Sequence, residues 1–225
     1  MTRTKLADRK LPDYTKGEEI ANMVTHIAGA VFGVVALVLC VVRAALGHNG
    51  YRIVGAAIYG ASMLFLYTMS SVYHGMPAGM GKKVMQVLDH CSIYLLIGGT
   101  YTPIVLGPIR EMSPAIGWTL FGVVWGIGII AAVFTAIDHH KFRKLSMACY
   151  ILMGWTIVFA VKPTVEAITR TGLRYLLGGG VAYTIGAVLY GVGKKMRIRY
   201  MHTLFHVFVL AGTVLHFITV YRFCV

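Results

Sequence analysis

The sequence predicts an all-α membrane protein, a bundle of seven transmembrane helices. Of its 225 residues, 57% are hydrophobic and only 13% are charged, about half the charged fraction of an average soluble domain. The hydrophobic residues are gathered into seven long runs, at positions 20–46, 53–73, 84–106, 115–137, 145–161, 175–192 and 201–221. Each run is close to the ~20 residues that a helix needs to cross the hydrocarbon core. A membrane strand needs only about half as many residues, so these runs must be helices.

The first hydrophobic run follows a polar and charged start and is too long for the hydrophobic part of a signal peptide, so it is interpreted as a retained helix. The next three have the length of a full span. The fifth is the weakest, because it ends at Lys162-Pro163, where proline cannot continue a helix. Short connections between all seven predict one domain, 19–225, preceded by a segment, 1–18, on the cytoplasmic surface.

Three groups of glycines favour close packing between helices. Gly29 and Gly33 have small-xxx-small spacing, as do Gly122 and Gly126, and 178–180 is a glycine triplet that opens the predicted sixth helix. Such glycines usually let helix backbones approach closely in membranes. We therefore assign them a packing role and no chemistry.

The positive charges predict the orientation. Fourteen of the 21 Lys and Arg lie in the amino-terminal segment and in the second-to-third, fourth-to-fifth and sixth-to-seventh gaps. These regions all lie on one side of a seven-helix bundle. The positive-inside rule then places the amino terminus in the cytoplasm and the carboxyl terminus outside. The expected location is the inner cell membrane, which the chain crosses several times.

Composition also excludes other classes of protein. The formal net charge of +13 comes from basic residues in short gaps between apolar runs, and not from one solvated face with interleaved aromatics, so nucleic-acid binding is not predicted. The four cysteines, Cys40, Cys91, Cys149 and Cys224, are far apart and form no CxxC pair. They are interpreted as small apolar residues, with neither a disulfide framework nor a thiolate metal site.

Polar residues inside membrane helices are costly and are therefore functional candidates. The informative ones are Glu19, Asn22, His26, Ser70, His74, Asp89, His90, His202, His206 and His216. Helices one, three and seven begin on the cytoplasmic side and helix two ends there. All of these residues except His216 are therefore expected near the cytoplasmic end of the bundle, although more than 130 positions separate some of them.

Two of these histidines have the spacing of metal ligands. His202 and His206 are four residues apart, so their imidazoles project from one helical face and can bind one ion, as in HExxH zinc sites. His74 can add a third nitrogen, and three histidines with an open position are typical of catalytic zinc. Such an ion lowers the pKa of bound water to about 7. Asp89 is then the candidate general base or orienting group, and Ser70, one turn before His74, can hold the carbonyl or the water.

Structural roles that need no metal also stay open for these histidines. The same histidines can form a buried hydrogen-bond network that joins three helices without a metal. His139 and His140 are interpreted as solvated loop residues, and His216, nearer the outer side, as a satisfied polar residue in the bundle. His90 directly follows Asp89, so it faces about 100° away on a helix, and packing or hydrogen bonding is favoured over ligation.

Five motifs in order carry a resemblance to a known family. They are Glu19-x2-Asn22-x2-Thr25-His26, Ser70-Ser71-x-Tyr73-His74, Asp89-His90-x-Ser92-Ile93-Tyr94, Gly99-Thr100-Tyr101-Thr102-Pro103 and His202-x3-His206. Together they closely resemble the bacterial hemolysin III family. That family is related to the progestin and adiponectin receptors and, more distantly, to alkaline ceramidases. The resemblance covers the chain after residue 17.

The resemblance implies a seven-helix bundle with a cytoplasmic amino terminus. It also implies zinc held by His74, His202 and His206, with Asp89 near the zinc water and Ser70 as the motif serine. The first-helix motif is expected to pack or hydrogen-bond beside the site.

Three classes of function compete. The first is a zinc-dependent hydrolase that cleaves the amide or ester of a membrane lipid. The second is a non-enzymatic membrane protein with structural zinc: a pore, a transporter, or a sensor of lipids or membrane energetics. The mostly apolar outer halves of the helices argue against a wide aqueous channel. A receptor for an extracellular protein ranks last, because the outer loops are short. The sequence indicates neither the substrate nor the oligomeric state.

Overall fold

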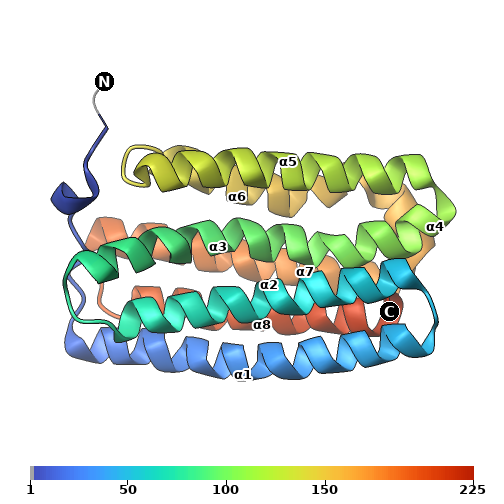
Figure 1. The fold of residues 1–225 in the computed structure, drawn as a ribbon, viewed down its shortest axis with the longest axis horizontal. Coiled ribbons are helices and arrows are strands. Elements are labelled where there is room, and N and C mark those ends of the chain that lie inside the picture. The colour runs from blue at the N-terminus through green and yellow to red at the C-terminus, as the bar shows by residue number, and fades with distance from the viewer. Residues whose placement is uncertain (1–2) are drawn as a thin grey trace.

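The computed structural model describes residues 3–225, and these form helices and no strand. The elements in order are η1 (Leu6–Asp8), α1 (Lys16–Leu46), α2 (Gly50–Gly75), α3 (Met80–Ile104), η2 (Val105–Ile109), α4 (Arg110–Met112), α5 (Pro114–Asp138), α6 (Arg143–Trp155), η3 (Thr156–Ala160), α7 (Val161–Met196) and α8 (Met201–Phe223). The long helices lie alongside one another in a bundle (Figure 1).

Within the described part of the chain, six helical segments are long and apolar enough to cross a membrane. Their outer surfaces are hydrophobic. Along α1, for example, the exposed side chains include Val31, Val35, Val38 and Val42, whereas Asn22 and His26 are buried. Apolar residues outside and polar residues inside suit a helix surrounded by lipid. The expected all-helical, multi-pass membrane bundle is therefore confirmed.

The fifth of these segments, Arg143–Met196, has 54 residues and would be about 81 Å long as one straight helix. The hydrocarbon core is only about 30 Å thick. The segment is interrupted by η3 and again at Thr169, whose backbone angles, φ 65° and ψ 167°, are not helical. Figure 1 shows α6 and α7 both running along the long axis of the bundle. Nε1 of Trp155, at the end of α6, donates to the Thr184 hydroxyl of α7 at 3.1 Å, so the chain turns back midway between these two residues, at the Thr169 interruption.

Two details of the predicted fifth and sixth helices are wrong. The helix expected to end at Lys162-Pro163 is interrupted earlier, at Trp155, and Pro163 lies in the first turn of α7. Proline is tolerated there because the first N–H groups of a helix have no partner within it. Since α7 already begins at Val161, the glycines at 178–180 lie within this helix and do not open it.

The glycine motifs divide into two kinds. A Cβ on Gly29 would lie 2.5 Å from the ring of Tyr67, and one on Gly33 would lie 3.3 Å from backbone of α2. These glycines allow α1 and α2 to approach closely, as expected. A Cβ on Gly122 or Gly126 would meet nothing within 4 Å, so the packing role predicted for that pair is wrong within this chain.

A capping box fixes the start of α1. The Thr15 hydroxyl accepts from the Glu18 N–H, and the Glu18 carboxylate accepts from the Thr15 N–H at 2.9 Å. The other oxygen of Glu18 accepts from the N–H of Tyr200 at 2.9 Å. Tyr200 has a left-handed backbone, φ 61°, in the turn before α8. One carboxylate therefore holds the start of α1 beside the start of α8.

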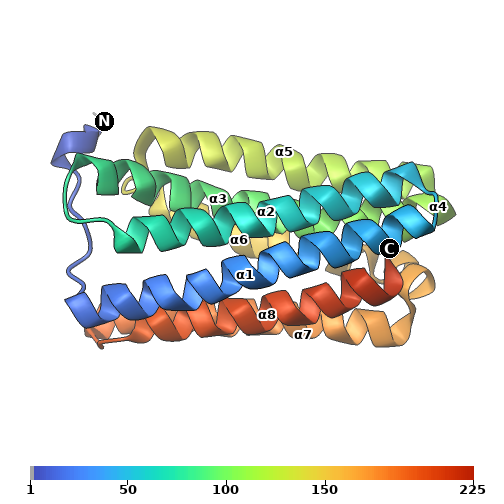
Figure 2. The ribbon, with the colours of Figure 1, turned by 60° about the horizontal axis from the view of Figure 1, so that its bottom comes forward.

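The amino-terminal segment does not lie loosely on the surface. Residues 3–15 cross the end of the bundle where α1 begins (Figures 1 and 2). Arg9 is only 2% exposed, and its guanidinium donates to the carbonyl of Ile137 at 2.6 Å and contacts Nδ1 of His139 at 3.3 Å. The Thr4 N–H donates to the Asp138 carboxylate at 2.8 Å. These contacts attach the segment to the end of α5.

The interpretation of His139 as a solvated loop residue is therefore wrong. His139 is 6% exposed, and burial, with the neighbouring His90 and His140 next, lowers its pKa to about 3. His140, by contrast, is exposed. The difference arises because Arg9 covers His139 from a segment 130 residues away.

Two apolar cores fill the bundle. One joins α1, α2, α3 and α8 around Tyr59 and Tyr67. The other joins α3, η2, α5, α6, η3 and α7 and includes Ile104, Ile109 and Ile168. The four cysteines are free.

Candidate metal centre

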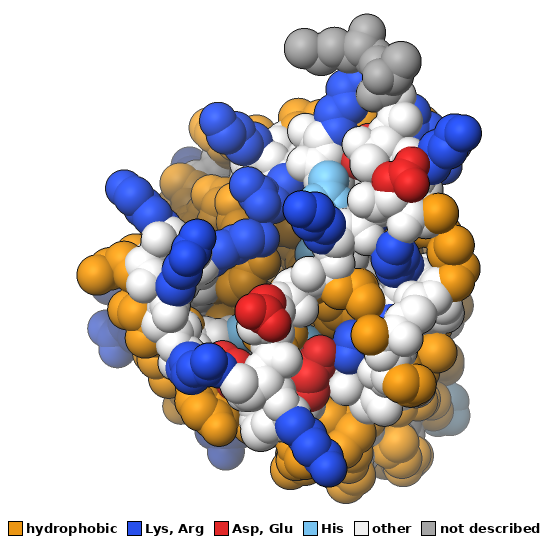
Figure 3. Space-filling model, turned by 90° about the vertical axis from the view of Figure 1, so that its left-hand side faces the viewer, with side chains coloured by type: hydrophobic (Ala, Val, Ile, Leu, Met, Phe, Trp, Pro, Cys, Tyr) orange, Lys and Arg blue, Asp and Glu red, His pale blue; other side chains and the backbone are white. Residues whose placement is uncertain are grey.

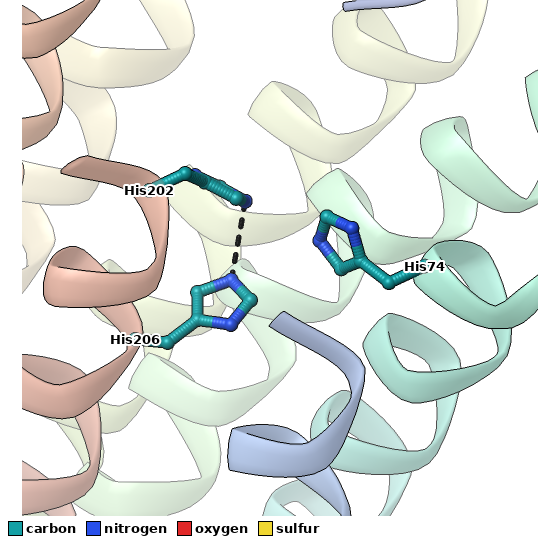
Figure 4. Close-up of side chains that lie close together, drawn as sticks. All are labelled: His74, His202 and His206. Carbon is teal, nitrogen blue, oxygen red and sulfur yellow. Dashed lines mark hydrogen bonds between the residues drawn. The ribbon is translucent and has the colours of Figure 1, made fainter. Parts of the chain in front are cut away.

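Three histidines from two helices meet inside the bundle. His74, near the end of α2, faces His202 and His206, near the start of α8 (Figure 4). One nitrogen of each lies within 4.8 Å of the others. His74 and His206 are buried, and His202 is half-buried. The antiparallel course of α2 and α8 thus brings together residues more than 120 positions apart, at the depth predicted from the sequence.

Glu19 of α1 orients His74. Its Oε2 lies 2.6 Å from Nδ1 of His74, and its Oε1 forms an ion pair with Lys82 at 2.7 Å. A carboxylate at this distance holds the proton on Nδ1, which leaves the lone pair on Nε2. Carboxylate–histidine pairs of this kind orient metal-binding imidazoles and make them more basic.

His206 is oriented by α1 as well. Its Nδ1 lies 3.3 Å from the carbonyl oxygen of Asn22 and 3.2 Å from the hydroxyl of Thr25. The Thr25 hydroxyl already donates to carbonyls of α1, so Nδ1 of His206 carries the proton and donates. His26 stacks on the His206 ring with 3.5 Å between centroids. The first-helix motif therefore packs and hydrogen-bonds beside the histidines, as expected.

The histidine nitrogens fit a metal ion. Nε2 of His74 is buried without a hydrogen-bond partner, and Nε2 of His202 lies 3.1 Å from Nε2 of His206. Two nitrogens bound to one tetrahedral zinc at ~2.0–2.1 Å lie about 3.3 Å apart. Three neutral imidazoles are a donor set that zinc accepts readily.

Ser70 and Asp89 line the same cavity as His202 and His206. Oγ of Ser70 is buried without a hydrogen-bond partner. The Asp89 side chain is 15% exposed, and Nδ1 of His90 is 3.6 Å from its carboxylate, too far for a hydrogen bond. That nitrogen instead donates to the Gln86 carbonyl at 2.8 Å, so the hydrogen-bonding role predicted for His90 is confirmed.

The cavity has a volume of about 410 Å³, within the usual range of ligand pockets. Along α7 its lining extends from Lys194 to Leu176, 18 residues or about 27 Å. At the deep end Nε2 of His216 donates to the Leu176 carbonyl at 3.1 Å, whereas its Nδ1 is buried without a partner. His216 is therefore only half satisfied, contrary to the sequence interpretation.

Tyr14 is a site residue that sequence reasoning missed. Its ring stacks on His202, with 5.2 Å between centroids and an angle of 15° between planes, and lies 5.9 Å from His74. Burial raises its pKa well above the ordinary value, so the phenol stays protonated. The only available signal was an aromatic residue just before the capping box of α1.

A family model described as Haemolysin-III related matches residues 14–217. The chain belongs to the haemolysin III family. It is similar to Hemolysin-3 of Bacillus cereus, with 38% identity over 92% of this chain and 90% of that protein. It is also similar to the Hemolysin-3 homolog of Bacillus subtilis, with 37% identity over 94% of this chain and 97% of that protein. A more distant relative is the human monocyte to macrophage differentiation factor, with 24% identity over 92% of this chain and 84% of that protein.

Proposed function

We propose that this haemolysin III protein is a zinc-dependent hydrolase that cleaves the amide or ester bond of a membrane lipid. The observation that carries the proposal is the cluster of three imidazoles beside a cavity that is also lined by a buried hydroxyl without a hydrogen-bond partner, Ser70, and by a partly exposed carboxylate, Asp89. A structural network alone would pair these groups with one another, because unpaired buried polar groups are costly.

We propose seven membrane crossings, with the segment Arg143–Met196 counted as two because the chain turns back at Thr169. The end of the bundle that holds residues 3–15 carries many Lys and Arg side chains (Figure 3), which supports a cytoplasmic amino terminus and an outer carboxyl terminus. In a bacterial cell the membrane that these helices would cross is the inner membrane. Residues 19–225 would then be the single transmembrane domain.

His74, His202 and His206 would hold the zinc, which when bound lowers the pKa of a coordinated water to about 7. Asp89 accepts the proton of the attacking water, and the Ser70 hydroxyl donates to the substrate carbonyl oxygen. The oxygen of the water deprotonated by Asp89 adds to the acyl carbon, the bond from that carbon to nitrogen or oxygen breaks, and Asp89 returns the proton to the leaving group. The products are a carboxylic acid and an amine or alcohol.

A pore has less support. At the end opposite the cavity mouth, the space between helices is filled by buried apolar side chains that include Ile104, Ile109 and Ile168. A conducting path needs polar groups or open space along the full depth of the membrane. The cavity instead ends at Leu176 and His216.

The test combines metal analysis with turnover. Purified wild type should contain one zinc per chain, and His74→Ala and His202→Ala should lose it. His140→Ala, an exposed histidine at the same end, should retain it. Zinc-loaded wild type should hydrolyse at least one member of a panel of acyl amides and esters, and Asp89→Asn should slow turnover without loss of zinc. A wild type that binds no zinc refutes the metal site. A zinc-loaded protein without turnover refutes the hydrolase and leaves a structural metal.

A further inference from the structure

Three cationic side chains line the mouth of the cavity. They come from three separate elements: Lys10 from the amino-terminal segment, Arg143 from the first residue of α6, and Lys194 from the last turn of α7. In residues 3–225, none of the three lies within ion-pair distance of a carboxylate. Figure 3 shows this end as a hollow bordered by Lys and Arg side chains, with hydrophobic side chains on its floor.

The orientation of the protein in the membrane does not account for this arrangement. The positive-inside rule counts charges on one side of the bilayer and does not require them to face a cavity. The chain provides its own comparison: Lys144 and Lys195 follow Arg143 and Lys194 directly, yet neither lines the cavity. The residues that line the cavity are therefore distinguished by position and not by charge alone.

The other lining groups follow in a definite order along the bundle. Asp89, the one acidic residue among the lining residues that the structure describes, lies nine residues into α3, about 13 Å from its start. His202 and His206 lie in the first two turns of α8 and line the same cavity. Beyond them the walls are mainly apolar and include Ile97 and Leu177. From its mouth inward, the cavity is thus lined first by cations, then by the candidate reaction centre, and then by the walls of an apolar tunnel.

We propose, resting on the proposed function, that the substrate is a single-chain acyl amphiphile whose leaving half carries an anion. The acyl chain occupies the apolar tunnel and the scissile bond lies beside the histidines. The anion is bound by Lys10, Arg143 and Lys194, because charge-assisted hydrogen bonds are stronger than those between neutral groups. A phosphate monoester of a lysophospholipid and the carboxylate of an N-acyl amino acid both meet this description.

The test measures binding, not turnover. The probes share one fluorescent acyl chain: a lysophosphatidate and an N-acylglycine as anions, with a monoacylglycerol and an N-acylethanolamine as their neutral counterparts. Anisotropy is measured with the detergent-solubilised full chain carrying His202→Ala, which prevents hydrolysis. We expect at least one anionic probe to bind about tenfold tighter than its neutral counterpart. The anion that shows the larger preference identifies the source.

Two double variants separate the mouth from the general surface charge. Arg143→Gln with Lys194→Gln should abolish the preference for the anion, and Lys144→Gln with Lys195→Gln should retain it. The charge-conserving variant, Arg143→Lys with Lys194→Arg, should keep most of the preference for the anion. That result would show that the Gln variant loses the preference through its missing charge and not through misfolding.

Equal binding of anionic and neutral probes overturns the inference. It is also overturned if the Lys144→Gln, Lys195→Gln variant loses the anion preference as fully as the Arg143→Gln, Lys194→Gln variant does. An anion preference in His202→Ala, together with no turnover by the zinc-loaded wild type, refutes the hydrolase alone. Turnover of neutral lipids without an anion preference refutes only the inference about substrate.

Discussion

Neutralising Glu19 should weaken metal binding although Glu19 donates no atom to the ion. In the structure its Oε2 lies 2.6 Å from Nδ1 of His74, which fixes the proton on that nitrogen and turns Nε2 towards His202 and His206. In Glu19→Gln the amide oxygen can still accept from Nδ1, so the ring stays in place, but the negative charge that makes Nε2 more basic is lost. Removal of such a partner typically costs 10–100-fold in metal affinity, or about 1.4–2.7 kcal/mol.

The assay is competition for zinc between the purified protein and a chromophoric chelator. We expect the Kd to rise at least tenfold in Glu19→Gln and further in Glu19→Ala, where the ring also loses its tether. Glu18→Gln is the matched control, because Glu18 caps α1 and contacts the turn before α8 without contacting a histidine. An unchanged Kd in Glu19→Gln, or an equal rise in Glu18→Gln, would show that the carboxylate does not act through His74.

Three further predictions concern acid sensitivity, packing and the Tyr14 stack. The folded state lowers the pKa of His139 to about 3 from an ordinary ~6.5, so the unfolded state binds the proton first as pH falls. The free energy of unfolding should therefore fall by about 2 kcal/mol between pH values above about 6.5 and pH 5. Thermal melting of His139→Asn should show a smaller loss of stability on acidification. Gly179→Ala would place a Cβ 2.3 Å from the His216 ring and should cost about 1–3 kcal/mol, whereas Gly191→Ala, with open space, should be neutral or stabilising; equal melting temperatures would contradict the packing. Tyr14→Ala should speed the release of zinc to a chelator and Tyr14→Phe should not, because the stack depends on the ring; equal rates in both would exclude a covering role.

The sequence predicted the meeting of the histidines because alternating membrane helices leave little freedom. Once hydrophobic runs define the spans, the depth of each residue follows from its distance to the end of its run. His74 ends one helix and His202 begins another, so both belong to the same end of the bundle whatever the detailed packing. The same reasoning placed Asp89 and Ser70 at that level, and the structure puts both in one cavity with His202 and His206.

The sequence could not show which neighbour a given face of a helix contacts. It also could not show the path of a segment that has no hydrophobic periodicity. Small-xxx-small spacing shows that Gly122 and Gly126 share a face of α5, but not that this face is open in the folded chain. The residues before α1 have no hydrophobic period, so no pattern indicated that Arg9 is buried against His139 or that Tyr14 stacks on His202. Those contacts depend on tertiary packing across more than 100 residues.

The histidines alone do not explain why the cluster can form, and α1 supplies the missing part. Glu19, Asn22 and His26 have the i, i+3, i+7 spacing of one helical face, and this face contacts both helices that carry the cluster: Glu19 contacts His74 of α2, whereas Asn22 and His26 contact His206 of α8. Without α1, two imidazoles would keep their helices but lose the groups that fix their protons and ring orientations. The first helix therefore acts as the positioning element of a site to which it contributes no nitrogen.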